Sequence, residues 1–144
     1  MTHFRNDLRV LPLAAGRGFL ISIMAIRDKL RANAAPLLQP GETIQAVFCA
    51  QTVSQYFALI SYWIIILSNA YRVVVVTDRR IMVCHSGRFT ITPVKDIETE
   101  VPRATRIGDP SGLWWPCTTL GKKLYVHRRF HKDVRDADAA LYAV

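Results

Sequence analysis

The sequence predicts an α+β fold that is mainly β: a leading helix, about seven short antiparallel strands arranged as a sandwich or barrel, and a closing helix. Short segments with alternating or β-branched apolar residues are separated by turn residues about every 8–12 positions. Helical spacing of apolar residues occurs only near the two ends of the chain. The chain has 144 residues, 51% of them hydrophobic, which is enough for one domain with its own core.

Residues 19–38 are predicted to form the leading helix. Leu20, Ile23 and Leu30 recur at three- and four-residue spacing, which places them on one helical face. Pro36 then indicates where the helix ends. This amphipathic pattern predicts a helix that packs against the sheet.

The expected strands share alternation or a run of β-branched residues. They are 42–53, 71–77, 80–85, 89–92, 94–101, 113–118 and 123–127. In one of them Asp96, Glu98 and Glu100 share a face, whereas Ile97 and Val101 lie on the other. We expect the acidic face to be solvated and the apolar face to point inward.

Residues 131–143 are predicted to form the closing helix. Val134, Ala137 and Leu141 form an apolar stripe at helical spacing. Such a terminal helix can cover an open end and an edge of a barrel. The expected architecture is therefore a partly open antiparallel barrel capped by its C-terminal helix.

The first 23 residues differ from the remainder of the chain. We expect residues 1–23 to be a poorly ordered or mis-started extension and residues 24–144 to be the domain, with Met24 as a plausible alternative start. The apolar run 19–26 is too short for a secretory signal and is followed at once by charged residues. The extension carries +2 of the net charge of +8, which leaves +6 on the domain.

The most apolar stretch is 56–67, with the sequence YFALISYWIIIL and no charge. As a helix it would rise about 18 Å, short of the roughly 30 Å hydrocarbon core of a membrane. Three interpretations are open: a buried strand or helix, an interfacial or re-entrant membrane segment, and an oligomer interface. The candidate membrane or partner contacts are Tyr56, Phe57, Tyr62, Trp63, Ile64, Ile65, Ile66 and Leu67.

A net charge of +8 and a pI of about 9.9 favour an anionic partner. The densest basic cluster is 127–132, with two lysines just upstream. Arginine matches phosphate geometry, so these side chains could contact anionic headgroups. The candidate contacts are Arg79, Arg103, Arg106, Lys122, Arg128, Arg129 and Lys132. The alternative is a set of solvated charges that pair with carboxylates of the closing helix.

Arg103 and Arg106 lie beside a proline-containing turn. The simpler expectation is that they pair with Glu98 or Glu100. If they converge instead with the arginines of the 127–132 cluster, they form an anion site.

No pattern in the sequence points to catalysis, a cofactor or a metal. There is no Ser/His/Asp arrangement and no glycine-rich phosphate loop, so we expect no enzyme. His127 and His131 straddle a strand-to-helix junction, which does not favour metal ligation. Cys49, Cys84 and Cys117 are odd in number and are expected to be reduced, buried thiols of a cytoplasmic protein. Nucleic-acid binding would depend on charge alone.

Several motifs resemble those of bacterial pleckstrin-homology-like (PH-like) domains. TDRR follows a valine-rich strand at 77–80, and PRATRIG, SGLW and KLYVHRRFHKD follow at 102–108, 111–114 and 123–133. Together with RDKLRANAAPLLQPGE at 27–42, they resemble a small actinobacterial family of PH-domain-containing proteins. The resemblance implies a seven-strand, partly open barrel capped by a helix, and no catalytic residues. The inositol-phosphate pocket of eukaryotic PH domains has no matching basic motif here.

These observations favour a non-enzymatic binding module. The first hypothesis is peripheral association with an anionic membrane surface, at the inner face of the cell membrane, through 56–67 and the basic residues. The alternative is a protein-interaction or self-assembly module that uses the same apolar segment, with a homo-oligomer as one form.

Overall fold

The computed structural model describes residues 24–52, 71–87 and 93–142. Three features named above lie outside these ranges: the extension 1–23, the apolar stretch 56–67 with its eight candidate contacts, and the expected strand 89–92. The fold and the sites below are built from the described residues.

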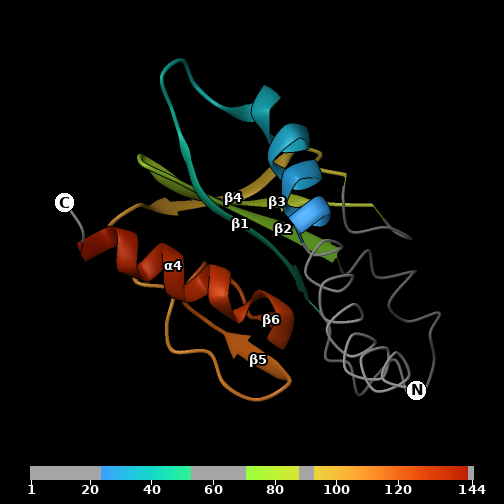
Figure 1. Ribbon diagram of the computed structural model, residues 1–144, viewed down its shortest axis with the longest axis vertical. Coiled ribbons are helices and arrows are strands. Elements are labelled where there is room, and N and C mark those ends of the chain that lie inside the picture. The colour runs from blue at the N-terminus through green and yellow to red at the C-terminus, as the bar shows by residue number, and fades with distance from the viewer. Residues whose placement is uncertain (1–23, 53–70, 88–92, 143–144) are drawn as a thin grey trace, which may run out of the picture.

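A single antiparallel sheet of six strands dominates the described structure, and it curls into a half-barrel (Figure 1). Its strands are β1 (Ile44–Gln51), β2 (Tyr71–Thr77), β3 (Arg80–His85), β4 (Ile97–Pro102), β5 (Trp114–Cys117) and β6 (Leu124–His127). The spatial order is β4-β3-β2-β1-β6-β5, so β4 and β5 lie at the two edges. This confirms the mainly β, α+β fold with a helix near each end, with six described strands against about seven expected.

The centre of the sheet is buried on both faces. Every residue from 72 to 77 in β2 is buried, and so are 46–50 of β1 and 81–84 of β3. The four consecutive valines of β2 suit this position, because β-branched side chains pack well on a pleated surface. The core therefore lies in β1–β3.

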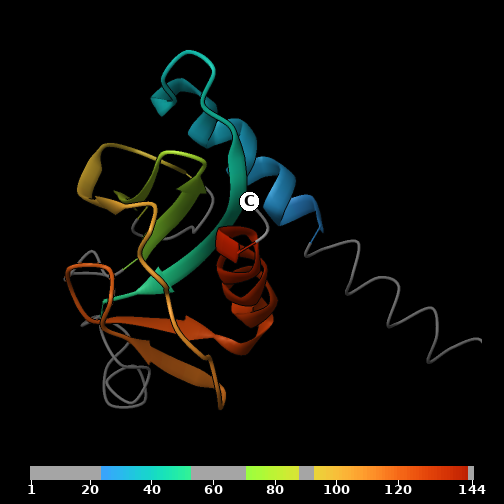
Figure 2. The same ribbon diagram turned by 90° about the vertical axis from the view of Figure 1, so that its left-hand side faces the viewer.

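Two helices lie on the same side of β1 (Figure 2). The N-terminal helix is described over 24–34 and continues into a 3-10 turn, η1 (Ala35–Leu37). The closing helix α4 (His131–Tyr142) follows a second 3-10 turn, η2 (Arg128–Phe130), and packs against β1. An ion pair between Arg27 and Asp133, 2.9 Å long, joins the two helices.

Several predicted boundaries were wrong by one to four residues, among them the ends of β1 and β5 and the start of β6. The α-helix ends at 34 rather than 38, because Pro36 lies at the start of η1 and favours the tighter turn. The first strand starts at Ile44 because Glu42 serves as a side-chain acceptor in the preceding turn. The strand expected over 94–101 is β4, which starts at Ile97 and extends to Pro102.

Candidate functional site

A basic groove of about 550 Å³ lies between the loop before β5 and the start of α4. It is lined by Ser111, Gly112, Leu113, Arg128, His131, Lys132 and Arg135. The backbone N–H of Arg128 donates to the carbonyl of Leu113 at 2.8 Å, which fixes the loop against η2. The groove therefore has one wall from the loop and one from η2 and α4.

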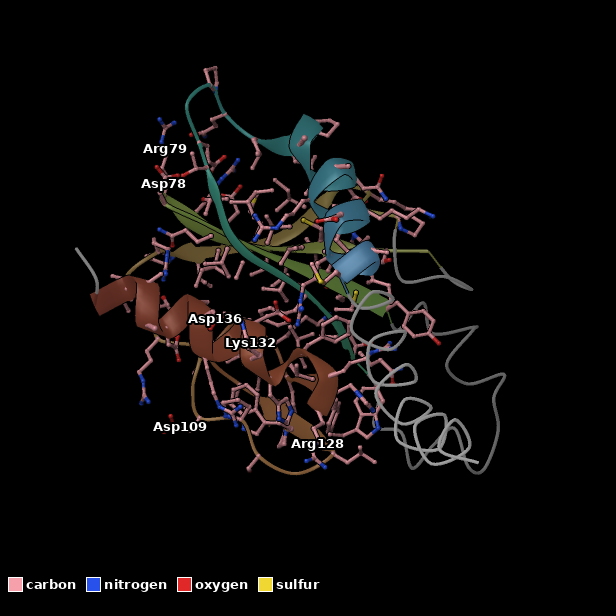
Figure 3. All side chains as sticks on the ribbon, viewed as in Figure 1. Asp78, Arg79, Asp109, Arg128, Lys132 and Asp136 are labelled. Carbon is pink, nitrogen blue, oxygen red and sulfur yellow. The ribbon has the colours of Figure 1, made fainter. Side chains whose placement is uncertain are left out.

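Arg128, Lys132 and Arg135 are the Lys and Arg side chains among the described residues that line the groove. They share one side of the segment formed by η2 and α4, because they are four and three residues apart. Among the described residues, no carboxylate pairs with Arg128, whose side chain is exposed. Lys132 bonds Asp136 at 2.9 Å, but its side chain remains 74% exposed (Figure 3). Arg135 reaches the carbonyl of Pro110 at 3.5 Å, the limit of a hydrogen bond. The groove thus presents positive charge that the neighbouring protein groups satisfy only in part.

An apolar side chain stands beside these cations. Leu113, the loop residue directly before β5, is 56% exposed and is one of two large hydrophobic side chains with high exposure among the described residues. The groove therefore combines cations with an apolar contact.

A second cavity, of about 280 Å³, lies on the other side of η2. It is lined by Cys49, Ala50, Gln51, Tyr71, Trp114, His127, Arg129 and Phe130. The pairing of Gln51 with both Tyr71 and Tyr125 brings the ends of β1, β2 and β6 together here. Arg128 and Arg129 are adjacent in sequence but line different cavities, so the predicted basic cluster does not form one surface.

His127 also lines this cavity, where its surroundings favour the neutral ring. Burial, together with the charges of Arg129 and His131, lowers the pKa of His127 below its ordinary value. Nδ1 of His127 accepts the backbone N–H of Arg129 at 3.1 Å, so the neutral ring carries its proton on Nε2. The His127 ring meets that of Trp114 edge-to-face at 4.9 Å between centroids.

The other predicted headgroup contacts are engaged elsewhere. Arg103 does not pair with Glu98 or Glu100: its Nε donates to Oε1 of Gln45 and its Nη2 to the carbonyl of Ala137, both at 2.7 Å. That prediction was wrong, because the turn after β4 directs Arg103 toward β1 and α4.

Arg106 likewise pairs with Asp109 at 2.6 Å rather than with the acidic strand. The glutamates of β4 pair with other cations: Glu98 pairs with Arg72 and with Lys122, and Glu100 pairs with Arg80. Neither Arg106 nor Lys122 lines the basic groove or the cavity beyond η2.

The TDRR motif at 77–80 has a structural role. Oγ1 of Thr77 donates to Glu42 at 2.6 Å, and Oδ1 of Asp78 accepts the backbone N–H of Thr43 at 3.0 Å. Arg80 donates to both oxygens of Glu42, at 3.0 and 3.1 Å. This Glu42 network, which comprises Glu42, Thr77 and Arg80, ties the β2–β3 turn to the start of β1.

The adjacent Arg79 bonds Oε1 of Gln39 at 3.3 Å and lies near Gly41, whose φ is +79°. A Cβ at Gly41 would meet the guanidinium at 3.3 Å. Arg79 therefore packs over the turn that precedes β1.

The three cysteines lie in the interior of the described structure. All three are free and buried, as the sequence predicted. Burial raises the pKa of Cys49 and that of Cys84 to about 12, which keeps both thiols protonated at neutral pH. Within the ranges described, no three His, Cys, Asp or Glu side chains gather where they could hold a metal ion.

Sequence reasoning identified Arg128 and Lys132 of the groove but missed Leu113 and Arg135. Arg135 follows Lys132 at three-residue spacing on the predicted helix, which is a pattern that could have revealed it. Leu113 had no such pattern, because its exposure depends on how the loop folds back on η2.

No family model, curated protein or solved structure matches this chain. The resemblance to PH-like domains therefore stays a prediction. None of the helices in the described part of the chain has the length and apolar character needed to cross a membrane.

Proposed function

We propose that this domain is a non-enzymatic binding module that associates peripherally with an anionic membrane surface. The observation that carries the proposal is the basic groove, where Arg128, Lys132 and Arg135 surround an open space beside the exposed Leu113. Arginine forms paired hydrogen bonds to phosphate oxygens, and a leucine at the rim can enter the headgroup layer. An inner membrane leaflet supplies both kinds of contact.

The binding free energy can be approximated from the side chains of the groove. Each cation near an anionic surface contributes about 1 kcal/mol, so Arg128 and Arg135 contribute about 2 kcal/mol and Lys132, already bonded to Asp136, contributes less. Burying the remaining exposed part of Leu113 adds about 1 kcal/mol. The groove alone supports weak, salt-sensitive association, which the apolar stretch 56–67 would strengthen if it also enters the surface.

Vesicle co-sedimentation tests the proposal. The full chain is mixed with phosphatidylserine–phosphatidylcholine vesicles or with phosphatidylcholine vesicles at low salt. We expect binding to the anionic vesicles only, and loss of that binding as salt is raised. The double variant R128Q/R135Q should bind about thirtyfold more weakly, since it removes two membrane-facing charges.

The matched control is R79Q/R106Q, which removes the same net charge from positions outside the groove. It should retain most of the binding. The proposal is wrong if the unaltered chain does not bind anionic vesicles at low salt, or if both double variants lose binding equally. Light scattering on the same samples reports self-assembly, and an oligomer whose formation excludes vesicle binding would favour the protein-interaction alternative.

A further inference from the structure

The cavity beyond η2 has features that the membrane proposal does not use. Three polar side-chain atoms in the described structure are buried without a hydrogen-bond partner: Oε1 of Gln51, Nη1 of Arg103 and Nε1 of Trp114. Two of the three belong to residues that line this cavity. Buried polar groups are almost always paired, so an unpaired acceptor and an unpaired donor at one cavity indicate a missing partner.

The charge of the lining indicates the sign of that partner. Among the described residues that line the cavity, Arg129 is the one Lys or Arg, and none is Asp or Glu. The guanidinium lies over the Phe130 ring, 4.9 Å from its centroid, and no described carboxylate pairs with it. The Nε2–H of His127 and the indole N–H of Trp114 add donors. A carboxylate fits this set of donors, because arginine binds it through two parallel bonds.

The other lining residues and the volume of the cavity indicate the size and the apolar character of the ligand. Tyr71, Trp114 and Phe130 contribute aromatic rings, and Ala50 contributes apolar surface. A volume of about 280 Å³ lies at the small end of ligand pockets, which span roughly 300–1,000 Å³. A single ring is the size that this space accepts, and Oε1 of Gln51 calls for a hydroxyl or amino donor on it.

We propose that the cavity beyond η2 binds a small aromatic carboxylate that carries a hydroxyl or amino group. The carboxylate meets Arg129 and the neighbouring donors, the ring packs among the aromatic side chains, and the donor reaches Gln51. This site is separate from the basic groove and does not depend on the membrane proposal.

The experiment uses hydroxybenzoate as the probe. The three tryptophans of the chain give three indole N–H signals in a ¹⁵N–¹H spectrum, and W114F assigns one of them by its loss. Titration of the unaltered chain with 3- or 4-hydroxybenzoate should shift the Trp114 signal saturably, with a dissociation constant of about 0.1–1 mM for a ligand of this size. Benzoate lacks the donor and hydroxybenzamide lacks the charge, so both should bind more weakly.

Two variants separate the roles of the lining residues. R129Q should weaken hydroxybenzoate binding about tenfold or more, because it removes the charged partner. Q51L should remove the preference for hydroxybenzoate over benzoate, since it removes the acceptor that distinguishes them. R128Q is the matched control: it belongs to the basic groove and should leave the titration unchanged.

The inference is wrong if no indole signal shifts with any of these probes, or if the shift survives unchanged in R129Q. Vesicle binding provides the complementary measurement. R129Q should retain it and R128Q/R135Q should lose it, so failure at one site is distinguishable from failure at the other.

Discussion

Replacing Glu42 by glutamine tests how far the Glu42 network stabilises the fold. The Glu42 side chain has no solvent exposure, and its carboxylate accepts bonds from Arg80, from Thr77 and from the backbone N–H of Gln39 at 2.9 Å. The bonds from Arg80 are the largest cause that lowers the pKa of Glu42 from 4.5 to about 2, against the opposing effect of burial. Glutamine keeps the shape of the side chain but removes the charge.

The lowered pKa sets the magnitude and the sign of the effect. The difference between 4.5 and about 2 corresponds to ~3 kcal/mol. Glutamine keeps one of the two acceptor oxygens and so retains part of this bonding, and we expect E42Q to lose about 2 kcal/mol at pH 7. Because the pKa is lower in the folded state, the stabilisation is complete above the unfolded value of 4.5 and is lost as pH falls toward 2.

Urea unfolding of the unaltered chain and E42Q, followed by tryptophan fluorescence between pH 7 and pH 3, measures the difference. We expect the loss in free energy of unfolding to shrink by about half at pH 3. E100Q is the control, because Glu100 also pairs with Arg80 but its side chain is 48% exposed; it should cost less than about 1 kcal/mol. A loss in E42Q that equals that in E100Q, or that does not change with pH, would refute the reasoning.

Three further predictions concern stability. Burial raises the pKa of Asp133 despite its pairing with Arg27, so the folded state disfavours the ionised carboxylate. In urea unfolding, D133N should therefore lower the free energy of unfolding less at pH 7 than at pH 4. This pH dependence is opposite to the one expected for E42Q. A methyl group at Gly121, where φ is +87°, would lie 2.9 Å from Cγ2 of Thr99, so G121A should lower the free energy of unfolding by about 1–2 kcal/mol, with partial recovery in G121A/T99S. R103M removes the bonds to Gln45 and to the Ala137 carbonyl and should lower the same quantity by about 1–3 kcal/mol.

The class of fold could be predicted because the pattern and the packing agree. The run YRVVVVT predicts a strand in isolation, and in the sheet it becomes β2, which is buried from 72 to 77. Thr77 and Asp78 likewise predicted the turn at 77–79. In the structure their side chains accept backbone N–H groups of Arg79 and Thr43 and so stabilise this turn. Strand order and curl were not accessible in the same way, because β1 pairs with β6, more than 70 residues away in sequence, through a contact that no local pattern encodes.

The candidate site was only partly predictable for a related reason. The run of basic residues 127–132 identified the right segment, but charge in a sequence does not say which side chains find partners. Arg103, Arg106 and Lys122 are bonded to distant or turn-dependent groups, whereas Arg128 is not bonded to any described side chain. Hydrogen-bond partners, rather than basic character, separate a structural cation from one that is available to a ligand.

The change of direction at η2 explains how one short segment can serve two surfaces. β6 ends at His127, whose Nδ1 accepts the N–H of Arg129 and thereby starts the 3-10 turn. In such a turn successive side chains point about a third of a revolution apart. Arg128 therefore faces the groove with α4, while Arg129 faces the cavity with β1 and β5. Because the same turn positions both arginines, H127A should weaken vesicle binding by removing the cap, although His127 does not line the groove. The same variant should also weaken hydroxybenzoate binding, to which His127 contributes a donor, whereas R128Q and R129Q should each affect one kind of binding alone.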